Sequence, residues 1–365
     1  MTEREAYVAF NLTDKVGAAT VGKLIARYGS AAAAWGEYPN KISRTGGEIE
    51  WEREFALAGK FGVEIVTMAD EKYPKSLRES PGGPLVLYVK GSVDALSLPS
   101  VAMIGTRRAT DYGLGVANRF SYDLCKASWC IVWGLALGID AESHRGALDA
   151  CGVTVGVLGS GLDMFYPEEN RPLAREIVEK GGAVASQFPF GRPADRTTFP
   201  IRNHVVAALA KGAVAVEAPA RSGTLITANI AAELGRTVMA VPGRIADRMS
   251  AGCLQLIREG AIAVRDVDDI IEALGPLAAA KVDRAGEKEK PAVADEEKPA
   301  YSVEEAMVML HVDEEGVSID ELVRETRLPV VKINSIVMTL RVKGFVRFLP
   351  GNRVALPQKW YNTRI

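Results

Sequence analysis

Between residues 99 and 264, short apolar runs alternate with longer segments of helical periodicity. The apolar runs are rich in Val, Ile and Ala, and most end at a glycine or another turn-forming residue. Nearly continuous apolar strands that alternate with helices are typical of a parallel sheet, because helices cover both of its faces. The pattern therefore predicts an α/β fold, an extended Rossmann-like domain with a doubly wound, mostly parallel sheet. The predicted strands have the sequences SVAMIG, CIVWG, VTVGVLG, AVASQF, AVAVEA, TVMAVPG and AIAV.

The segments that flank this region follow other patterns. In residues 1–68, apolar residues at helical spacing follow the Gly-containing turn VGAATVG, which predicts a small SAM-like or helix-hairpin-helix-like domain. Such a turn either contacts a DNA backbone or forms a plain helical hairpin, and both interpretations stay open. Residues 69–275 hold the predicted Rossmann-like domain, which the chain enters through a Pro/Gly-rich connection and the short strand LVLYVKG.

The C-terminal part of the chain predicts a linker and a second small domain. Residues 276–300 are rich in Ala, Lys, Glu and Pro and contain little to bury, which predicts a flexible linker. Residues 301–365 contain three helical segments and a hairpin, FVRFLPGNRVAL, which is the outline of a winged helix. Ser318 and Glu321 have the spacing of a capping box at the start of the second helix.

Composition limits where a charged ligand could bind. The formal net charge of the 365 residues is −2, so any nucleic-acid surface has to be a local basic groove. The four cysteines lack C-x-x-C spacing, which favours buried, reduced thiols and a cytoplasmic location. The N-terminus carries charge where a signal peptide needs an apolar run, and no stretch is long and apolar enough to span a bilayer. No membrane partner is expected.

Residues that immediately follow the predicted strands share small size, hydroxyl groups or guanidinium groups. In open α/β sheets ligands bind outside the carboxyl ends of the strands. Small residues let the backbone approach a phosphate, and guanidinium groups match its oxygens. We therefore predict a phosphate-binding site there, made of Gly105, Arg107, Thr110, Gly134, Gly138, Gly159, Ser160, Gly161, Phe199, Arg202, Asn203, Ser222, Gly223, Thr224 and Arg244.

The chain lacks the motifs that would add chemistry to this site. It has no G-x-x-x-x-G-K-[ST] sequence, and no G-x-G-x-x-G follows the first strand of the domain. The three histidines are dispersed, and no serine has a histidine at a suggestive spacing. We therefore predict a binding site without a catalytic residue, a metal or a cofactor.

Several segments together resemble one family. GTRRAT, GLALGID, GSGLDMFYPEEN, FPIRNH, VEAPARSGTLITANIAAELGR and AVPG occur in the order found in the DNA-processing protein A (DprA) family. The similarity runs from about residue 70 to 275, and the flanking helical and winged-helix segments resemble the longer members. The resemblance implies a bacterial cytoplasmic protein that binds single-stranded DNA as a homodimer, without enzymatic activity. It also implies that the protein delivers incoming strands to the RecA recombinase during natural transformation.

The resemblance also implies roles for individual residues. The family's G-x-R motif falls on Gly105 and Arg107, its F-P-x-R-N motif on residues 199–203, and its S-G-T turn on residues 222–224. Arg107 and Arg202 would clamp phosphates, unless Arg107 forms a structural salt bridge. Phe199 would stack on a base or serve as a core aromatic. Several positions depart from the family pattern, which puts the affinity in doubt more than the function: Trp133, Leu137, Gln187, His204 and Leu254.

Two other functions remain to be weighed. A nucleotide-binding enzyme of the phosphoribohydrolase (lysine-decarboxylase-like) type would share the architecture and a glycine-rich phosphate turn. Its catalytic glutamate would closely follow that turn, whereas here the first carboxylate is Glu233, about 13 Å along a helix from Thr224. A nucleotide-sensing transcription factor would use the winged helix as its output. The third helix of that domain is weakly basic, which favours contact with a protein or weak binding of duplex DNA.

Overall fold

The structure is a computed structural model that describes residues 1–38, 41–44, 47–275, 303–313, 316–343, 345–349, 351 and 353–356. The chain forms two compact units, residues 1–279 and residues 280–365. The predicted linker, residues 276–300, lies outside the described residues. Each unit is described by itself.

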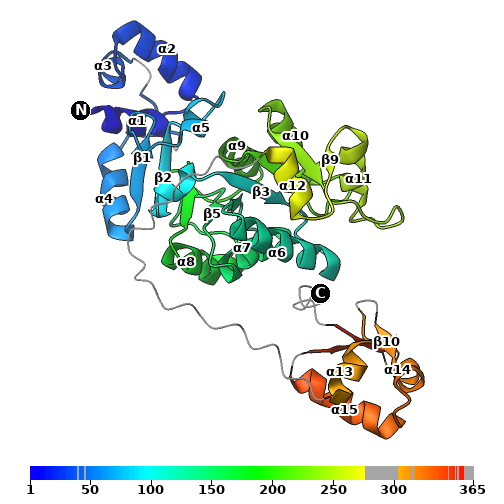
Figure 1. The fold of residues 1–365 in the computed structure, drawn as a ribbon. Helices are drawn as coiled ribbons and strands as arrows, with labels where there is room; N and C mark the ends of the chain where they lie inside the picture. The colour runs from blue at the N-terminus through cyan, green and yellow to red at the C-terminus, as the bar shows by residue number, and fades with distance from the viewer. Residues whose placement is uncertain are drawn as a thin grey trace. The chain divides into compact units, whose positions relative to one another are not determined.

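The described part of the first unit is built on a nine-stranded sheet, in the order β1-β2-β6-β5-β4-β3-β7-β8-β9 (Figure 1). Strands β3 to β9 run parallel, whereas β2 pairs antiparallel with both β1 and β6. The strands are β1 (Glu64–Thr67), β2 (Val86–Gly91), β3 (Ser100–Ile104), β4 (Cys130–Trp133), β5 (Thr154–Val157), β6 (Ala183–Ser186), β7 (Gly212–Ala215), β8 (Thr237–Ala240) and β9 (Ile262–Ala263). The predicted fold class, a mostly parallel α/β sheet, is confirmed, and every strand predicted between residues 85 and 264 is present.

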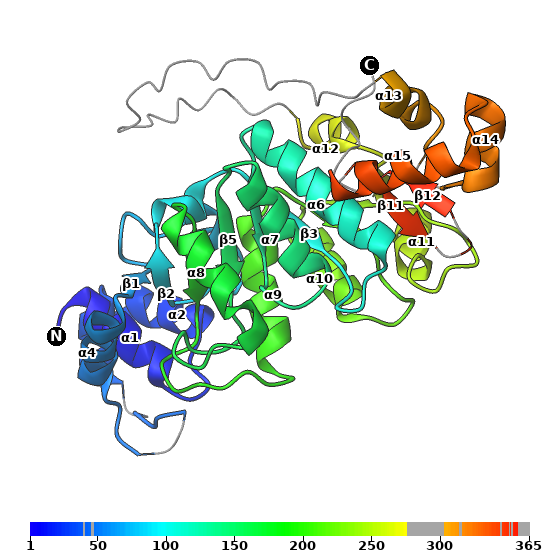
Figure 2. The same ribbon diagram turned by 90° about the horizontal axis from the view of Figure 1, so that it is seen from below.

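Helices cover both faces of this sheet (Figures 1 and 2). One face carries α6 (Asp111–Lys126), α7 (Ile139–Asp149), α8 (Arg171–Glu179) and α12 (Val267–Leu274), and the other carries α9 (Thr198–Leu209), α10 (Gly223–Glu233) and α11 (Ala251–Arg258). Strand β3 is buried along its whole length. Its Val101 and Met103 pack with α6, whereas Ala102 packs in the cluster of α9 and α10. This alternation follows from the two-residue period of a strand and explains why β3 reads as continuously apolar.

The order of the strands reverses beside β3. From β3 the chain proceeds through β4 and β5 to β6 on one side and then returns to β7 on the other side. Such a reversal opens a crevice at the carboxyl ends of the central strands, where α/β sheets bind ligands. The fold therefore gathers the loops that follow β3, β4, β5 and β7 at one edge.

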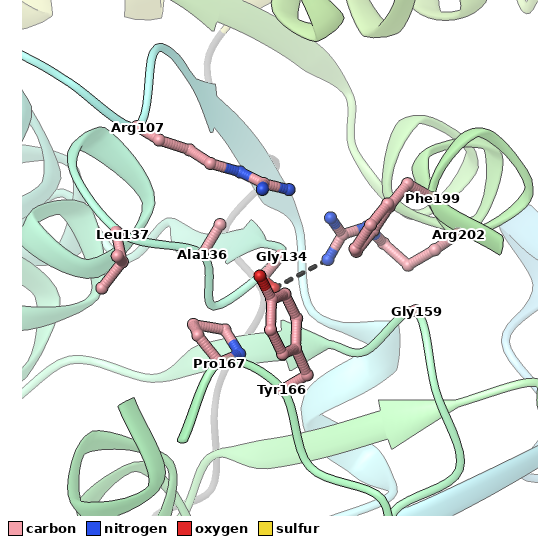
Figure 3. A pocket seen from close by; sticks show the side chains of 9 residues that line it. All are labelled: Arg107, Gly134, Ala136, Leu137, Gly159, Tyr166, Pro167, Phe199 and Arg202. Carbon is pink, nitrogen blue, oxygen red and sulfur yellow. Dashed lines mark hydrogen bonds between the residues drawn. The ribbon is translucent and has the colours of Figure 1, made fainter. Parts of the chain in front are cut away.

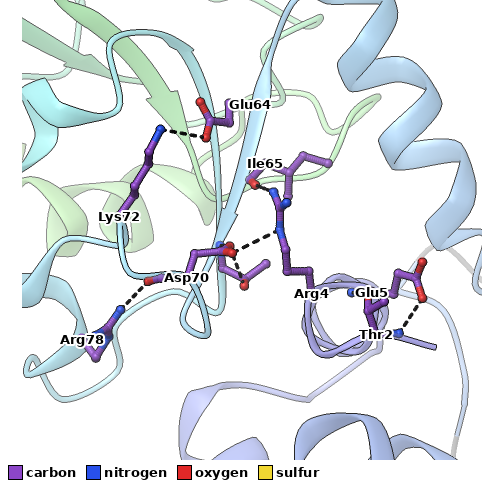
Figure 4. A network of polar contacts seen from close by, with 9 residues as sticks. Thr2, Arg4, Glu5, Glu64, Ile65, Asp70, Lys72 and Arg78 are labelled. Carbon is purple, nitrogen blue, oxygen red and sulfur yellow. Dashed lines mark hydrogen bonds and ion pairs between the residues drawn. The ribbon is translucent and has the colours of Figure 1, made fainter.

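Strand β1 was not predicted, and it attaches the N-terminal helices to the sheet. The helices α1 (Glu3–Leu12), α2 (Ala18–Tyr28), α3 (Ala31–Glu37) and α4 (Trp51–Phe61) share one apolar cluster with β1 and β2. Arg4 of α1 donates to the carbonyl of Ile65 in β1 and pairs with Asp70 (Figure 4). Asp70 in turn accepts from the backbone N–H and hydroxyl of Thr67. The boundary predicted at residue 68 therefore lies within the first unit.

The described part of the second unit has the predicted winged-helix outline. It contains α13 (Val303–Met309), β10 (Val317–Ser318), α14 (Ile319–Thr326), α15 (Val330–Val342), β11 (Arg347–Leu349) and β12 (Arg353–Ala355). Strand β10 adds a third strand to the predicted hairpin, in the order β10-β12-β11. Ser318 is the N-cap of α14, and its side chain accepts from the backbone N–H of Glu321. Apolar residues of the three helices and the small sheet form a core of their own.

Substitution of Gly146 tests how closely α6 and α7 pack, and Gly22 in α2 provides the control. A Cβ atom added at Gly146 of α7 would lie 2.1 Å from the carbonyl oxygen of Asn118 in α6, whereas one added at Gly22 of α2 would meet nothing within 4 Å. We expect Gly146→Ala to lower the free energy of unfolding by about 1–3 kcal/mol, because the helices are forced apart. The control, Gly22→Ala, should raise it by about 0.5–1 kcal/mol through lower backbone entropy of the unfolded chain. Urea denaturation measures the free energy of unfolding of both variants, and equal values would contradict the close packing of α6 on α7.

Candidate functional site

A hollow lies at the carboxyl ends of β3, β4 and β5 (Figure 3). Its volume is about 30 Å³, which holds a water molecule and falls far below the space that a buried small-molecule ligand occupies. The lining residues come from the loops after these strands and from α9: Arg107, Gly134, Ala136, Leu137, Gly159, Tyr166, Pro167, Phe199 and Arg202. The hollow is therefore a shallow surface feature with two arginines and two aromatic rings.

Phe199 lines one side of this hollow (Figure 3). It lies in the first turn of α9 and is half-buried. The guanidinium carbon of Arg107 lies 5.2 Å from the centroid of the Phe199 ring, within the range of a cation–π contact. The ring of Tyr166, whose centroid is 6.3 Å from that of Phe199, is tilted by 47°. Phe199 is thus partly packed against its neighbours, and it also lines the hollow.

Arg202 holds the base of the hollow together. Its side chain is buried, with 5% exposed, and its Nη1 donates to the carbonyl oxygens of Gly134 (2.7 Å) and Val157 (2.6 Å). These carbonyls lie at the ends of β4 and β5, so one side chain of α9 joins both strands. Its Nε donates to Asn203 Oδ1 at 2.9 Å. A side chain at Gly134 would collide with the guanidinium, because a Cβ atom there would lie 2.1 Å from Nη1.

The burial of Arg202 is balanced by Asp140. Asp140 is 2% exposed and accepts a hydrogen bond from the backbone N–H of Ala136 at 3.2 Å. Burial raises the pKa of Asp140 to about 6, although the nearby Arg202 opposes the shift. Burial likewise lowers the pKa of Arg202 to about 10, and Asp140 opposes that shift. At neutral pH both groups are charged, and the carboxylate offsets part of the positive charge beneath the hollow.

Arg107 differs from Arg202 in being exposed. It lies in the loop that joins β3 to α6, and it forms no ion pair with any described residue. Figure 3 shows its guanidinium extended toward Phe199 and Arg202. The backbone of its loop packs on Gly138, which has φ +77° and where a Cβ would lie 2.4 Å from the carbonyl oxygen of Thr106. Arg107 is therefore an available cation on a tightly packed loop.

The remaining predicted residues do not line the hollow. Ser160 is fully buried, Gly161 donates its backbone N–H to the carbonyl of Arg192, and Thr110 caps α6. Asn203 donates to the hydroxyl of Thr227 at 2.9 Å and so joins α9 to α10. The residues that lie outside the lining are Gly105, Thr110, Gly138, Ser160, Gly161, Asn203, Ser222, Gly223, Thr224 and Arg244. Among them, Ser222 is the N-cap of α10, and Gly223 and Thr224 form its first turn.

Four lining residues were not among the predicted site residues: Ala136, Leu137, Tyr166 and Pro167. Tyr166 is the most informative of them, because 51% of its surface is exposed beside Phe199. Its signal in the sequence was the aromatic pair in MFYPEEN, directly after the turn that follows β5. Leu137 had been noted only as a departure from a family pattern, and in Figure 3 its side chain points away from Phe199.

The different environments of the two arginines predict different effects on stability. Arg202→Met removes three buried hydrogen bonds and leaves Asp140 without its cation, so the free energy of unfolding should fall by about 3 kcal/mol. Arg107→Met changes an exposed side chain and should change the free energy of unfolding by less than about 0.5 kcal/mol. Urea denaturation followed by tryptophan fluorescence compares the two. An Arg202→Met protein as stable as the parent would show that Arg202 does not hold the strands together.

No helix in the described part of the chain is long and apolar enough to cross a membrane. Among the described residues, no group of three or more His, Cys, Asp and Glu side chains could hold a metal ion.

Comparisons with known proteins agree with the fold. Residues 64–275 match the family model described as DNA recombination-mediator protein A, and residues 290–352 match the DprA winged helix domain. The first match begins at β1. The solved structure of DNA processing protein A from Streptococcus pneumoniae superposes with a TM-score of 0.64 and 31% identity, over 74% of this chain and 98% of that one. The DNA processing protein A from Helicobacter pylori, whose structure is described as giving insight into its single-stranded DNA binding mode, superposes with a TM-score of 0.52 and 28% identity, over 58% and 95%.

Sequence relatives give the same result. Protein Smf from Synechocystis is 32% identical over 319 residues, which cover 80% of this chain and 79% of that protein. DNA processing protein DprA from Bacillus subtilis is 37% identical over 223 residues, which cover 61% and 75%. The family model alone spans more than half of the chain. This chain therefore belongs to the DNA recombination-mediator protein A family.

Proposed function

We propose that this protein binds single-stranded DNA at the Arg107–Phe199 hollow and carries it as a recombination mediator, without chemical turnover. The observation that supports this most is the exposed guanidinium of Arg107 over the half-buried ring of Phe199, with the ring of Tyr166 beside it. Single-strand sites combine cations that follow the backbone with aromatic rings on which bases stack. The relative from Helicobacter pylori, described by its single-stranded DNA binding mode, supports the choice of ligand.

The two arginines have separate tasks in this proposal. Arg107 contacts a phosphate directly, because it is exposed and unpaired among the described residues. Arg202 contributes mainly as scaffold and as positive charge, since Nε and Nη1 are used within the protein. Its Nη2 has no protein acceptor among the described residues, which leaves one nitrogen for a phosphate oxygen. The stacking of bases on Phe199 and Tyr166 is sequence-tolerant, as a carrier of arbitrary strands requires.

The shape of the site argues against a nucleotide-processing enzyme. The hollow of about 30 Å³ does not enclose a nucleotide. The turn that would hold a phosphate, at Ser222–Thr224, begins α10, whereas Glu233 is the last residue of the same helix. A helix of this length separates its ends by about 15 Å, so this carboxylate does not reach a group bound at the turn.

The wider role in the proposal is delivery of strands to RecA during natural transformation, by a homodimer in the bacterial cytoplasm. Membership of the recombination-mediator family supports it. The second unit fits contact with a protein better than contact with duplex DNA, because α15 has few free cations. Lys332 of α15 pairs with Glu304, and Lys343, the C-cap of α15, pairs with Glu305 at 2.8 Å. The division of the chain into four parts, with boundaries at residues 68, 275 and 300, is also part of this proposal.

Neighbouring arginines provide a matched test of the site. Arg107 lines the hollow, whereas Arg108 is also exposed but does not line it. We expect Arg107→Ala to weaken binding of a labelled oligothymidylate by about 10- to 100-fold, the effect of one charge-assisted contact. It should also lower the magnitude of the slope of log K against log salt by about 0.7. Fluorescence anisotropy at two salt concentrations measures both quantities. Equal losses for Arg107→Ala and Arg108→Ala would remove the hollow from the binding site.

Because Asp140 is buried beside Arg202, we expect the binding of oligothymidylate to strengthen in mild acid. Because Asp140 has a pKa of about 6, lowering the pH from 7.5 to 5.5 protonates it and removes a negative charge beside Arg202. The affinity for oligothymidylate should rise by roughly threefold over this range. Burial holds the pKa of His144 at about 3, so it stays neutral throughout. Asp140→Asn should bind at pH 7.5 as the parent does at pH 5.5, with little pH dependence. A variant that keeps the full pH dependence would exclude Asp140 as its source.

A further inference from the structure

A buried carboxylate occupies the point at which the strand order reverses. Glu217 follows β7 and is 1% exposed. Its Oε2 accepts from the backbone N–H of Thr110 at 2.9 Å, and its Oε1 accepts from the Thr110 hydroxyl at 2.5 Å. Thr110 is the N-cap of α6, which begins beside β3. The carboxylate thus lies at the start of α6, between the ends of β3 and β7.

This is the place where an α/β sheet would hold a phosphate. The first helix after the central strand presents free backbone N–H groups and the positive end of its dipole, which favour an anion. Here the anion belongs to the chain itself. The sequence also leaves room for it: a Cβ atom on Gly113, in the first turn of α6, would lie 2.3 Å from Glu217 Oε2.

The same residue fixes the loop that carries Arg107. The carbonyl oxygen of Glu217 accepts from the backbone N–H of Thr106 at 2.9 Å, and its carboxylate holds Thr110 on the other side. The loop is therefore attached to the end of β7 immediately before and shortly after Arg107. With both ends fixed, the Arg107 guanidinium is directed over the Phe199 ring.

We propose that Glu217 is a specificity-determining and positioning residue. Its carboxylate is an internal anion that fills the cradle at the start of α6 and excludes free phosphate-bearing ligands from it. Phosphate binding is thereby confined to the neighbouring Arg107–Phe199 hollow. By holding Thr110, the carboxylate also positions Arg107. The second role rests on the proposed function, whereas the first does not.

Two substitutions at Glu217 separate the roles. Glu217→Ala empties the cradle, so it should gain saturable binding of inorganic phosphate in isothermal titration calorimetry, which the parent lacks. Because the Arg107 loop loses this attachment, the affinity of Glu217→Ala for oligothymidylate should fall by about tenfold. Glu217→Gln keeps the shape of the side chain and an acceptor for the Thr110 N–H. It should therefore bind no phosphate and keep oligothymidylate affinity within about twofold of the parent.

Thr110→Val is the second variant, in case Glu217→Ala does not fold. It removes the hydroxyl that donates to Glu217, and it should weaken oligothymidylate binding by about threefold. A folded Glu217→Ala protein that binds no phosphate would overturn the exclusion role. Parent-like oligothymidylate binding by Thr110→Val, or losses in Glu217→Gln as large as in Glu217→Ala, would overturn the positioning role. If the parent itself fails to bind oligothymidylate, the proposed function fails, and the phosphate titration still tests the exclusion.

Discussion

The candidate site depends on the buried guanidinium of Arg202. Parallel strands leave their last carbonyls unpaired at the sheet edge, and here one side chain from α9 satisfies those of Gly134 and Val157. Because the same helix carries Phe199 in its first turn, this interaction also sets the height of the aromatic ring above the strands. The cation itself is tolerated because Asp140 lies buried nearby and because Gly134 leaves it space.

The proposed function, binding without chemistry, rests on how charge is distributed around this centre. The buried cation is compensated and structural, whereas the exposed one, Arg107, is free to meet a phosphate. In our proposal the start of α6 is a second anion-binding position, and the carboxylate of Glu217 fills it. The Arg107–Phe199 hollow is therefore a shallow cationic surface with aromatic rings rather than an enclosed pocket. Such a surface suits a polymer that is held at intervals and released intact.

Much of the fold was predictable because burial on both faces of the sheet makes its strands continuously apolar. Strand β1 was not predicted because it has only four residues, of which Glu64 is exposed. So short a pattern of apolar residues cannot be distinguished from the patterns of the helices around it. The candidate site was predictable only in part. From the sequence, Arg107 and Arg202 were both predicted to clamp phosphates. In the structure Arg107 is exposed and Arg202 is buried, and this difference depends on packing between distant segments. Thr110 was predicted to be a phosphate ligand. Its hydrogen-bond partner, Glu217, lies 107 positions away in the chain, so the local sequence does not show that the hydroxyl is already used. Tyr166 was missed because nothing local shows that its loop turns toward α9.

The central claim is that a single strand lies across the Arg107–Phe199 hollow. The most direct measurement is photocrosslinking of the full chain to an oligothymidylate that carries one 5-iodouracil, followed by mass spectrometry of the digested adduct. The account predicts adducts on Tyr166 or Phe199, the two rings that face the hollow, and competition by unlabelled oligothymidylate. Efficient and competable crosslinks that fall only elsewhere, such as on the second unit, would contradict it.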